Sequence, residues 1–434
     1  MKLQIEKAVY GGAGLAHQTE GERAGQAVFV PFTLPAELVE ANLLEQGNTF
    51  GEASLIKVLI ASKDRIQPRC AHFGQCGGCY YQHAAYSSQV QMKVAILQET
   101  LERAGLVALP AIETHIDEPW AYRNRTRLRI AELDGVLRVG YNRRGSNEFL
   151  AIHECPISAA LLLRAAEALL QGAAENPAVA RWLRTAVEVE FFTTANEKKL
   201  QMTVFVQKEQ PGFSTLWERM QEHVPELVGS SVFLLSPKGS QRRTRSQRHL
   251  GDWGAEGISY PAAGEDYWVS RGGFFQVNRF IIDELVRIVT DGRQGSLAWD
   301  LYAGVGLFSR VLARAFQQVV AVEAAANDLS KSFRGPGKHA VEATTVEFLR
   351  KAVVQRERPR LIVMDPPRAG VGAEVCDLLA RVAAPQIVYV SCDPVTLARD
   401  LRSLTTAGYN IAELHMVDMF PQTFHLETVA VLRR

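Results

Sequence analysis

The sequence lacks any apolar run of the roughly 20 residues that a membrane span needs, and Met1–Lys7 contains no apolar segment of a signal peptide. It also lacks a charge imbalance, because Lys and Arg total 48 against 47 Asp and Glu. Its 33 Gly and 18 Pro are too few for collagen-like or disordered chains. We therefore expect a folded cytoplasmic protein without membrane contact, and only local clusters of charge can indicate a nucleic-acid partner.

Cysteine is scarce as well, which excludes a small scaffold held by disulfides. A length of 434 residues predicts about three domains at roughly 150 residues each. In a long cytosolic chain, few cysteines favour metal ligands or catalytic thiols over disulfides. The six are Cys70, Cys76, Cys79, Cys155, Cys376 and Cys392.

The spacing of apolar residues changes twice along the chain. Short period-two runs separated by Gly and Pro predict a β-barrel over residues 1–62. Residues 63–260 mix strands and helices without a parallel rhythm, which predicts an α+β domain that also holds a cysteine-bearing loop. Residues 261–434 alternate continuous apolar strands with helices, which is typical of a doubly wound α/β sheet.

A turn at Asp300–Gly306 lies where the first strand of this α/β region meets a helix. Its glycines allow a ligand to approach the backbone, and Glu323, at the end of the next strand, is placed to bind two ribose hydroxyls. A tight strand-to-helix turn without a ligand is the alternative interpretation. The third glycine of dinucleotide sites is missing, whereas Asp365–Pro367 resembles the signature of S-adenosylmethionine-dependent methyltransferases.

Arg368 follows this signature, where amino-group methyltransferases usually carry an aromatic residue, so a different nucleophile is expected. Cys392 follows a predicted strand and precedes a helix, at the carboxyl edge of the sheet. A thiolate there can add to carbon 6 of uracil and activate carbon 5 for methylation. Glu427 and His425 are candidates for the base that removes the carbon 5 proton, and Cys376 fits a core position.

Three segments together closely resemble the RNA uracil-5-methyltransferases, and the match runs over nearly the whole chain: Asp365–Gly370, Tyr389–Asp400 and Asp418–Glu427. The resemblance implies that Cys392 is the nucleophile and that Glu427, rather than His425, is the base. It also implies a cofactor pocket for S-adenosylmethionine lined by Gln276, Tyr302, Glu323 and Asp365. The segment Gly273–Asn278 looks like the family's entry to the catalytic domain.

Two departures from the family pattern concern the adenine end of that pocket. Leu307 stands where many members carry Asn, and the usual acidic or amide residue is replaced around Thr344 or Thr345. An atypical segment, Ser332–His339, precedes them. The departures affect the expected adenine contacts and leave the thiol chemistry unchanged.

Four cysteines, Cys70, Cys76, Cys79 and Cys155, form a short-spaced trio with a distant fourth. An all-cysteine set can hold structural zinc or an iron-sulfur cluster, and free thiols are a third alternative. A radical S-adenosylmethionine centre is disfavoured, because such enzymes use three cysteines at another spacing. The set resembles the four-iron, four-sulfur site of the larger members of the same family, which implies a cluster here.

Positive charge gathers on one face of a predicted strand, which indicates an RNA contact if no anion within the chain offsets it. The four residues are Arg123, Arg125, Arg127 and Arg129. A second cluster spans Arg242–Arg248, and the N-terminal barrel resembles the TRAM domain, an OB-like RNA-binding module. The target uracil is expected in a loop or in locally melted RNA, since the base must be flipped out.

The resemblance as a whole favours a monomeric enzyme that methylates carbon 5 of a uridine in 23S rRNA. The T-loop uridine of tRNA is the alternative target. The alternative to an enzyme is an RNA-binding factor whose methyl-donor site has decayed. Leu307 and the irregular segment after Glu323 motivate this alternative.

Overall fold

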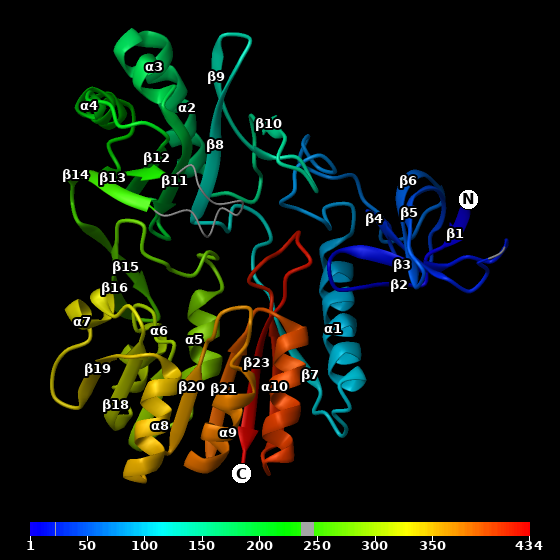
Figure 1. Ribbon diagram of the computed structural model, residues 1–434, viewed down its shortest axis with the longest axis vertical. Coiled ribbons are helices and arrows are strands. Elements are labelled where there is room, and N and C mark those ends of the chain that lie inside the picture. The colour runs from blue at the N-terminus through cyan, green and yellow to red at the C-terminus, as the bar shows by residue number, and fades with distance from the viewer. Residues whose placement is uncertain (22, 236–246) are drawn as a thin grey trace.

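The computed structural model describes residues 1–21, 23–235 and 247–434 and arranges them in three large sheets and one hairpin (Figure 1). The arginines at 242, 243 and 245 of the second predicted cluster lie outside the described residues. No helix within these ranges is both long and apolar enough to cross a membrane. The predicted fold class is confirmed: a doubly wound α/β sheet follows a curled N-terminal β-sheet and an α+β region.

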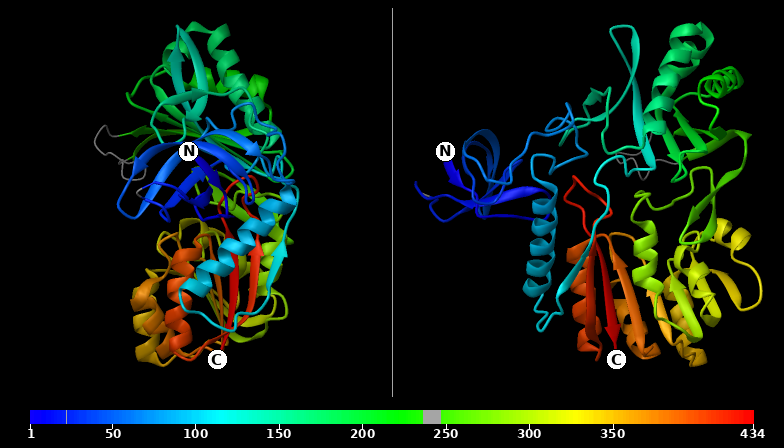
Figure 2. Two further views of the ribbon diagram at one scale, coloured as in Figure 1. Left: turned by 90° about the vertical axis from the view of Figure 1, so that its right-hand side faces the viewer. Right: turned by 180° about the vertical axis from the view of Figure 1, so that it is seen from behind.

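The N-terminal sheet has six strands in the order β1-β5-β6-β4-β3-β2. A small apolar core fills its concave side, because alternate residues of each strand point inward. The rear view in Figure 2 shows this sheet projecting to one side of the molecule. Its strands are β1 (Lys2–Gln4), β2 (Lys7–Ala8), β3 (Ala13–His17), β4 (Ala27–Pro31), β5 (Leu38–Gln46) and β6 (Phe50–Ile60).

The central region contains a seven-stranded sheet in the order β10-β9-β8-β11-β12-β13-β14. An apolar core joins it to α2 (Ala160–Glu175), α3 (Pro177–Leu183) and α4 (Phe213–His223). The strands are β8 (Arg125–Leu133), β9 (Val136–Asn142), β10 (Phe149–Ala151), β11 (Ala186–Thr193), β12 (Leu200–Val206), β13 (Leu227–Leu235) and β14 (Gln247–Gly254). The hairpin of β15 (Gly257–Ala262) and β16 (Glu265–Ser270) leads from it to the C-terminal region.

The C-terminal sheet has eight strands in the order β19-β18-β17-β20-β21-β23-β22-β7. Its strands pair in parallel except at β23, which runs antiparallel to both neighbours. The strands are β7 (Ile112–His115), β17 (Gly295–Leu301), β18 (Phe316–Glu323), β19 (Lys338–Glu342), β20 (Leu361–Met364), β21 (Gln386–Ser391), β22 (Asn410–Val417) and β23 (Glu427–Arg433).

Two apolar cores cover the two faces of this sheet, which explains why its strands read as continuous apolar runs. In β20, Ile362 and Met364 belong to one core, and Leu361 and Val363 to the other. The first core includes α1 (Tyr86–Arg103), α8 (Thr345–Gln355), α9 (Gly372–Val382) and α10 (Pro394–Thr406). The second includes α5 (Ile282–Thr290), α6 (Leu307–Leu312) and α7 (Asn327–Ser332).

Residues 86–115 pack with the C-terminal sheet, although the sequence analysis grouped them with the central domain. Helix α1 lies against α10, and β7 pairs with β22 at the edge of the sheet. The apolar stripe of α1, with Ile96, Leu97 and Leu101, is fully part of the core of that sheet. Local spacing of apolar residues carries no information about the strands that α1 covers.

Candidate active site and cysteine pocket

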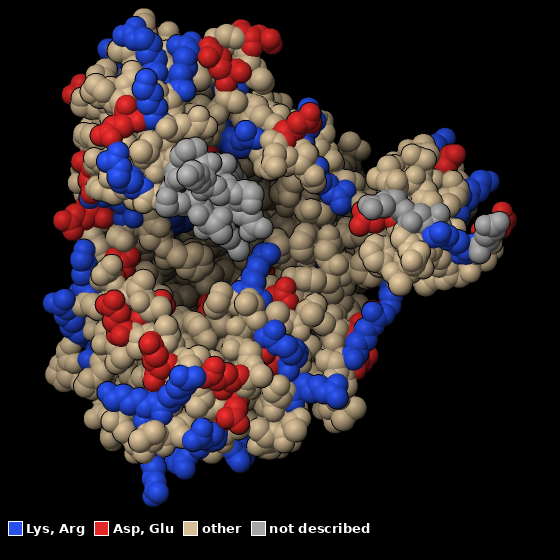
Figure 3. All heavy atoms as spheres, viewed as in Figure 1, with Lys and Arg blue, Asp and Glu red and all other residues tan. Residues whose placement is uncertain are grey.

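The proposed reacting side chains follow strand ends at one edge of the C-terminal sheet. Asp365 follows β20, Cys392 follows β21, and Glu427 begins β23. Ser391 is paired with Thr428 in the antiparallel register of β21 and β23, so the next step along the register places Cys392 opposite Glu427. The carboxyl ends of β20 and β21 point toward the central region (Figure 1), and Figure 3 shows the face between the two regions hollowed.

Burial governs the electrostatics of this pair. Burial, with Glu427 and Asp365 adding to it and Arg368 opposing it, raises the pKa of the Cys392 thiol to about 11. Burial also raises the pKa of the Glu427 carboxyl well above its usual range, again with Asp365 adding to the shift. In the ligand-free protein at neutral pH, the Cys392 thiol therefore holds its proton, and burial shifts the Glu427 carboxyl toward its protonated form.

His425, the other candidate base, faces Arg368. The guanidinium Nη2 lies 3.1 Å from His425 Nδ1. Burial and this positive charge lower the pKa of His425 to about 4, so its ring is neutral at physiological pH. Glu427 is directly beside Cys392 in the strand register, whereas His425 precedes the strand and contacts Arg368.

Gln276 lies next to Asp365, as a shared pocket requires. The Gln276 side chain donates through Nε2 to Asp365 Oδ2 at 3.3 Å, and the Gln276 backbone carbonyl accepts from Asn124 Nδ2 at 2.9 Å. Asn124 is fully buried and also donates to the Tyr260 hydroxyl. Burial, with Asp300 adding to it, raises the pKa of Asp365 to about 7. Sequence reasoning missed Asn124, because its neighbours in the sequence are the arginines that drew attention.

The turn after β17 brings the other two predicted cofactor residues together. Tyr302 has a φ of 62°, and the Gly304 amide donates to Glu323 Oε2 at 2.9 Å. An added Cβ at Gly304 would meet nothing within 4 Å, so the backbone there is open to a ligand. One carboxyl oxygen of the buried Asp300, Oδ1, has no partner in the described chain. The open turn and the nearby carboxylate fit the ribose end of a nucleoside cofactor.

The residues that depart from the family pattern have structural roles. Leu307 is buried, and its carbonyl accepts from the Tyr267 hydroxyl at 2.9 Å. Thr344 caps α8 in a reciprocal arrangement with Glu347. Thr345 is the one that reaches the pocket, because its side chain hydrogen-bonds to the Tyr302 hydroxyl.

The N-terminal sheet region reaches the same edge. The Tyr10 hydroxyl donates to Asp393 Oδ2 at 3.2 Å, next to Cys392. The ring of Tyr10 also packs edge-on against Phe424, with 5.6 Å between ring centroids. Nothing in the sequence predicts this contact, because 383 residues separate Tyr10 from Asp393.

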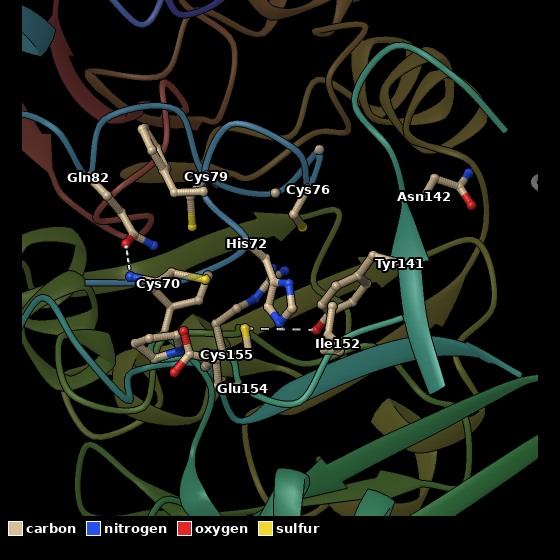
Figure 4. A pocket seen from close by; sticks show the side chains of 16 residues that line it. Cys70, His72, Cys76, Cys79, Gln82, Tyr141, Asn142, Ile152, Glu154 and Cys155 are labelled. Atoms are coloured by element: carbon tan, nitrogen blue, oxygen red, sulfur yellow. Dashed lines mark hydrogen bonds between the residues drawn. The ribbon is translucent and has the colours of Figure 1, made fainter. Parts of the chain in front are cut away.

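Four cysteines from two distant segments line one pocket of about 260 Å³, as Figure 4 shows. Cys70, Cys76 and Cys79 come from the loop before α1, and Cys155 comes from the loop after β10. Burial raises the pKa of the Cys70 thiol to about 11 and that of Cys79 to about 12. The structure thus brings together the four thiols that the sequence analysis grouped.

The spacing of these thiols matters for what they can hold. A single tetrahedral zinc ion needs sulfur atoms about 3.8 Å apart, since each Zn–S bond is about 2.3 Å. Within the described residues, no three of the four Sγ atoms lie within 4.8 Å of one another. Arg123 also lines the pocket, and its charge interacts with Cys79 and Cys155. The four Sγ atoms are therefore spread more widely than a single zinc ion requires, and Arg123 places a positive charge beside them.

The arginine face of β8 has anionic partners within the chain. Arg125 pairs with Glu190 at 2.5 Å and lies over the Phe192 ring. Arg127 pairs with Glu188 at 2.6 Å, and Arg123 lines the cysteine pocket. Arg129 donates to the Asn142 side chain and to the Asn147 carbonyl. Arg125 and Arg127 therefore need no external anion to offset their charges, because Glu190 and Glu188 already do so.

Comparison with known proteins agrees with this geometry. Residues 342–434 match the family model described as tRNA (Uracil-5-)-methyltransferase. An uncharacterized RNA methyltransferase of Aquifex aeolicus is 32% identical over 100% of this chain and 98% of its own length. The 23S rRNA (uracil(1939)-C(5))-methyltransferase RlmD of Chromohalobacter salexigens is also 32% identical, over 100% of this chain and 89% of its own.

One solved structure shares the fold over the full length of both chains. It is the Pyrococcus abyssi tRNA (uracil-54, C5)-methyltransferase in complex with S-adenosyl-L-homocysteine, at a TM-score of 0.73 and 22% identity. Fold and full-length relatives together define an S-adenosylmethionine-dependent RNA methyltransferase. Within that class, the chain belongs to the RNA uracil-5-methyltransferase family, as the sequence resemblance predicted.

Proposed function

We propose that this enzyme methylates carbon 5 of a uridine in 23S rRNA, with Cys392 as nucleophile and Glu427 as base. The observation that carries the proposal is the position of Cys392 opposite Glu427 across β21 and β23, with Asp365 at the neighbouring strand end. Charges from Glu427 and Asp365 both act on the Cys392 thiol, which indicates that the three groups share one site.

In this mechanism the Cys392 thiolate forms a bond to carbon 6 of the uracil, which places negative charge on carbon 5. S-adenosylmethionine, when bound, would supply an electrophilic methyl group to that carbon and leave as S-adenosylhomocysteine, whose sulfur keeps the electron pair of the broken bond to the methyl group. Glu427, as carboxylate, then takes the proton from carbon 5, the bond between sulfur and carbon 6 breaks, and the thiolate returns. Arg368 favours the thiolate, because it is the positive charge that lowers the pKa of Cys392.

The cofactor would occupy the strand ends next to this pair. Glu323, which accepts from the Gly304 amide, is placed for the ribose hydroxyls, and Tyr302 hydrogen-bonds to Thr345. Asp365, beside Gln276, is close enough to Cys392 for its charge to act on the thiol. These assignments rest on the open turn at Gly304 and on the hydrogen bond between Gln276 and Asp365.

Replacing the two reacting residues separates the two halves of the mechanism. Cys392→Ala is expected to bind RNA and cofactor but to transfer no methyl group, since carbon 5 is never activated. Glu427→Gln is expected to accumulate a covalent protein-RNA adduct that already carries the methyl group and survives denaturation. Gel shift under denaturing conditions, with labelled methyl donor, measures both.

The matched control is Cys376→Ala, which removes a buried thiol from α9 and is expected to retain turnover. Wild-type turnover in Cys392→Ala, or free methylated product without adduct in Glu427→Gln, would contradict the assigned role. Failure of the wild type to bind S-adenosylmethionine at millimolar concentration would favour an RNA-binding factor instead.

The 23S rRNA target is supported by the full-length relative RlmD, whose name gives that substrate. The T-loop uridine of tRNA is the second candidate, because the Pyrococcus abyssi neighbour acts on tRNA and shares the fold. Incubating ribosomal and transfer RNA transcripts with labelled cofactor distinguishes them, and label in tRNA alone would contradict the ribosomal target.

We further propose a four-iron, four-sulfur cluster bound by Cys70, Cys76, Cys79 and Cys155. The pocket volume and the spacing of the thiols support it over a single zinc ion, and the adjacent Arg123 would offset the negative charge of the four thiolates. Anaerobically purified protein is expected to be brown, with about four irons per chain. Colourless folded protein with zinc in this pocket would contradict the cluster.

RNA binding in this proposal involves the curled sheet of residues 1–62, which reaches the active-site edge through Tyr10. Arg129 is the member of the arginine face that we retain as an RNA contact, since its described hydrogen bonds are to uncharged groups. The enzyme would act as a cytoplasmic monomer, which sedimentation of the free protein tests.

A further inference from the structure

Two histidines and a glutamate gather at the far edge of the C-terminal sheet, away from the strand ends described above. Glu113 and His115 lie two residues apart on β7 and so share a face of the strand. His415 comes from β22 and is in register with Glu113. One ligand atom from each of the three lies within 4.8 Å of the others.

The distances match those of ligands around a single metal ion. His115 Nε2 lies 3.1 Å from His415 Nδ1, and His415 Nδ1 lies 3.5 Å from Glu113 Oε2. Bonds of about 2.05 Å in a tetrahedral zinc site place neighbouring ligand atoms about 3.4 Å apart. The two separations lie on either side of that value, and the third pair of ligand atoms lies within 4.8 Å.

The contact between His115 and Glu284 favours the tautomer of His115 that can bind a metal ion through Nε2. Its Nδ1 lies 2.7 Å from Glu284 Oε1, so the proton is held there and the lone pair of Nε2 faces His415. A carboxylate behind a ligating histidine is the usual support of a metal site. Arg287 holds Glu284 in turn, through two contacts of 2.6 Å.

The surrounding pocket has room for an ion with its water. It measures about 280 Å³ and includes Arg287, Arg293 and Arg433 in its lining. Arg287 and Arg433 are paired with Glu284 and Glu413, and Arg293 donates to backbone carbonyls. Two of the three positive charges are therefore offset by carboxylates, and a cation bound by His115 Nε2 and His415 Nδ1 would replace the proton of the hydrogen bond between them.

We propose that Glu113, His115 and His415 form a zinc site with a fourth position open to water. Two imidazoles and one carboxylate suit zinc better than calcium or magnesium, which prefer oxygen ligands. The ion would link edge strand β7 to β22 and so fasten the segment of residues 86–115 to the C-terminal sheet.

Titration of Zn²⁺ into the cluster-loaded enzyme by calorimetry tests the site, with anomalous scattering at the zinc edge to locate the ion in crystals. One ion per chain is expected at Glu113, His115 and His415. His415→Gln is expected to weaken affinity about 100-fold or more, and Glu284→Gln by about 10- to 100-fold through its support of His115. His17→Gln removes a histidine paired with Glu6 at 2.7 Å elsewhere and is the matched control.

Three results would overturn the proposal. They are no binding at millimolar Zn²⁺, affinity unchanged in His415→Gln, and zinc density only at the cysteine pocket. Inorganic phosphate serves as a competing probe, and phosphate bound to Arg293 and Arg433 in place of zinc would assign the pocket to an anion. Methyl transfer by Cys392 does not depend on this result, because the residues of the two sites are distinct.

Discussion

The motif around Cys392 predicts a reactive thiol, whereas the pKa of that thiol depends on contacts that only the structure shows. The sequence predicted a nucleophilic thiol and favoured a low pKa, because a helix begins directly after it. The structure instead raises that pKa to about 11, since burial and two carboxyl groups act against the helix. At neutral pH the thiolate is therefore only a small fraction of Cys392 in the ligand-free protein.

Alkylation of Cys392 tests this environment. Because reaction follows the thiolate fraction, the rate is expected to rise about tenfold per pH unit from about pH 7 to about pH 9 without reaching a plateau. Arg368→Met raises the pKa by removing a positive charge and slows the reaction at fixed pH, whereas Glu427→Gln removes a negative charge and accelerates it. Peptide mass spectrometry resolves Cys392 from Cys376, and a plateau below pH 8 would contradict the raised pKa.

At the scale of single elements, α10 connects helix stability with the active site. Asp393 caps its N-terminus by accepting from the amides of Val395 and Thr396, both at 3.0 Å. The same carboxylate accepts from Tyr10 through its other oxygen. One side chain thus holds the start of the helix, the residue after Cys392 and the N-terminal region.

Asp393→Ala is expected to cost about 1 kcal/mol of unfolding free energy through the lost cap, and to reduce methyl transfer as well. Asn176→Ala is the matched control, because Asn176 caps α3 in the same way, with a proline following it. Denaturant unfolding and turnover are measured for both variants. Equal turnover in the two would show that the Asp393 contact has no catalytic consequence.

The elements that sequence reasoning predicted best are those whose neighbours lie close in the chain. The strand-helix alternation after residue 295 and the strand ends at Asp365 and Cys392 follow from local spacing. The position of β7 beside β22 does not, because about 300 residues separate His115 from His415. The arginines of β8 were interpreted without their partners for the same reason, since Glu188 and Glu190 lie on another strand.

At the scale of the whole molecule, a buried ion pair joins the first half of the chain to the last turn before β23. Lys93 Nζ lies 2.7 Å from Asp418 Oδ1, and neither side chain is exposed. Lys93 also donates to the Phe420 carbonyl, and the Tyr86 hydroxyl donates to Asp418. Helix α1 therefore holds the loop that leads to Glu427.

Lys93→Met leaves the Asp418 charge buried without its partner and is expected to cost about 3–5 kcal/mol of unfolding free energy. Lys7→Met is the control, because Lys7 pairs with Glu99 at the surface and its loss is expected to cost less than about 1 kcal/mol. Urea unfolding measures both. A small, equal loss in the two variants would contradict the importance of the buried pair.

The place of α1 and β7 in the C-terminal sheet has a consequence for biosynthesis. Both leave the ribosome early, but β22 and Asp418 emerge about 300 residues later, which at 5–20 residues per second is a delay of roughly 15–60 s. During that time the face of α1 that lies against α10 and the edge of β7 that pairs with β22 lack these partners. The nascent segment of residues 86–115 therefore reaches its place in the C-terminal sheet only after β22 has been made.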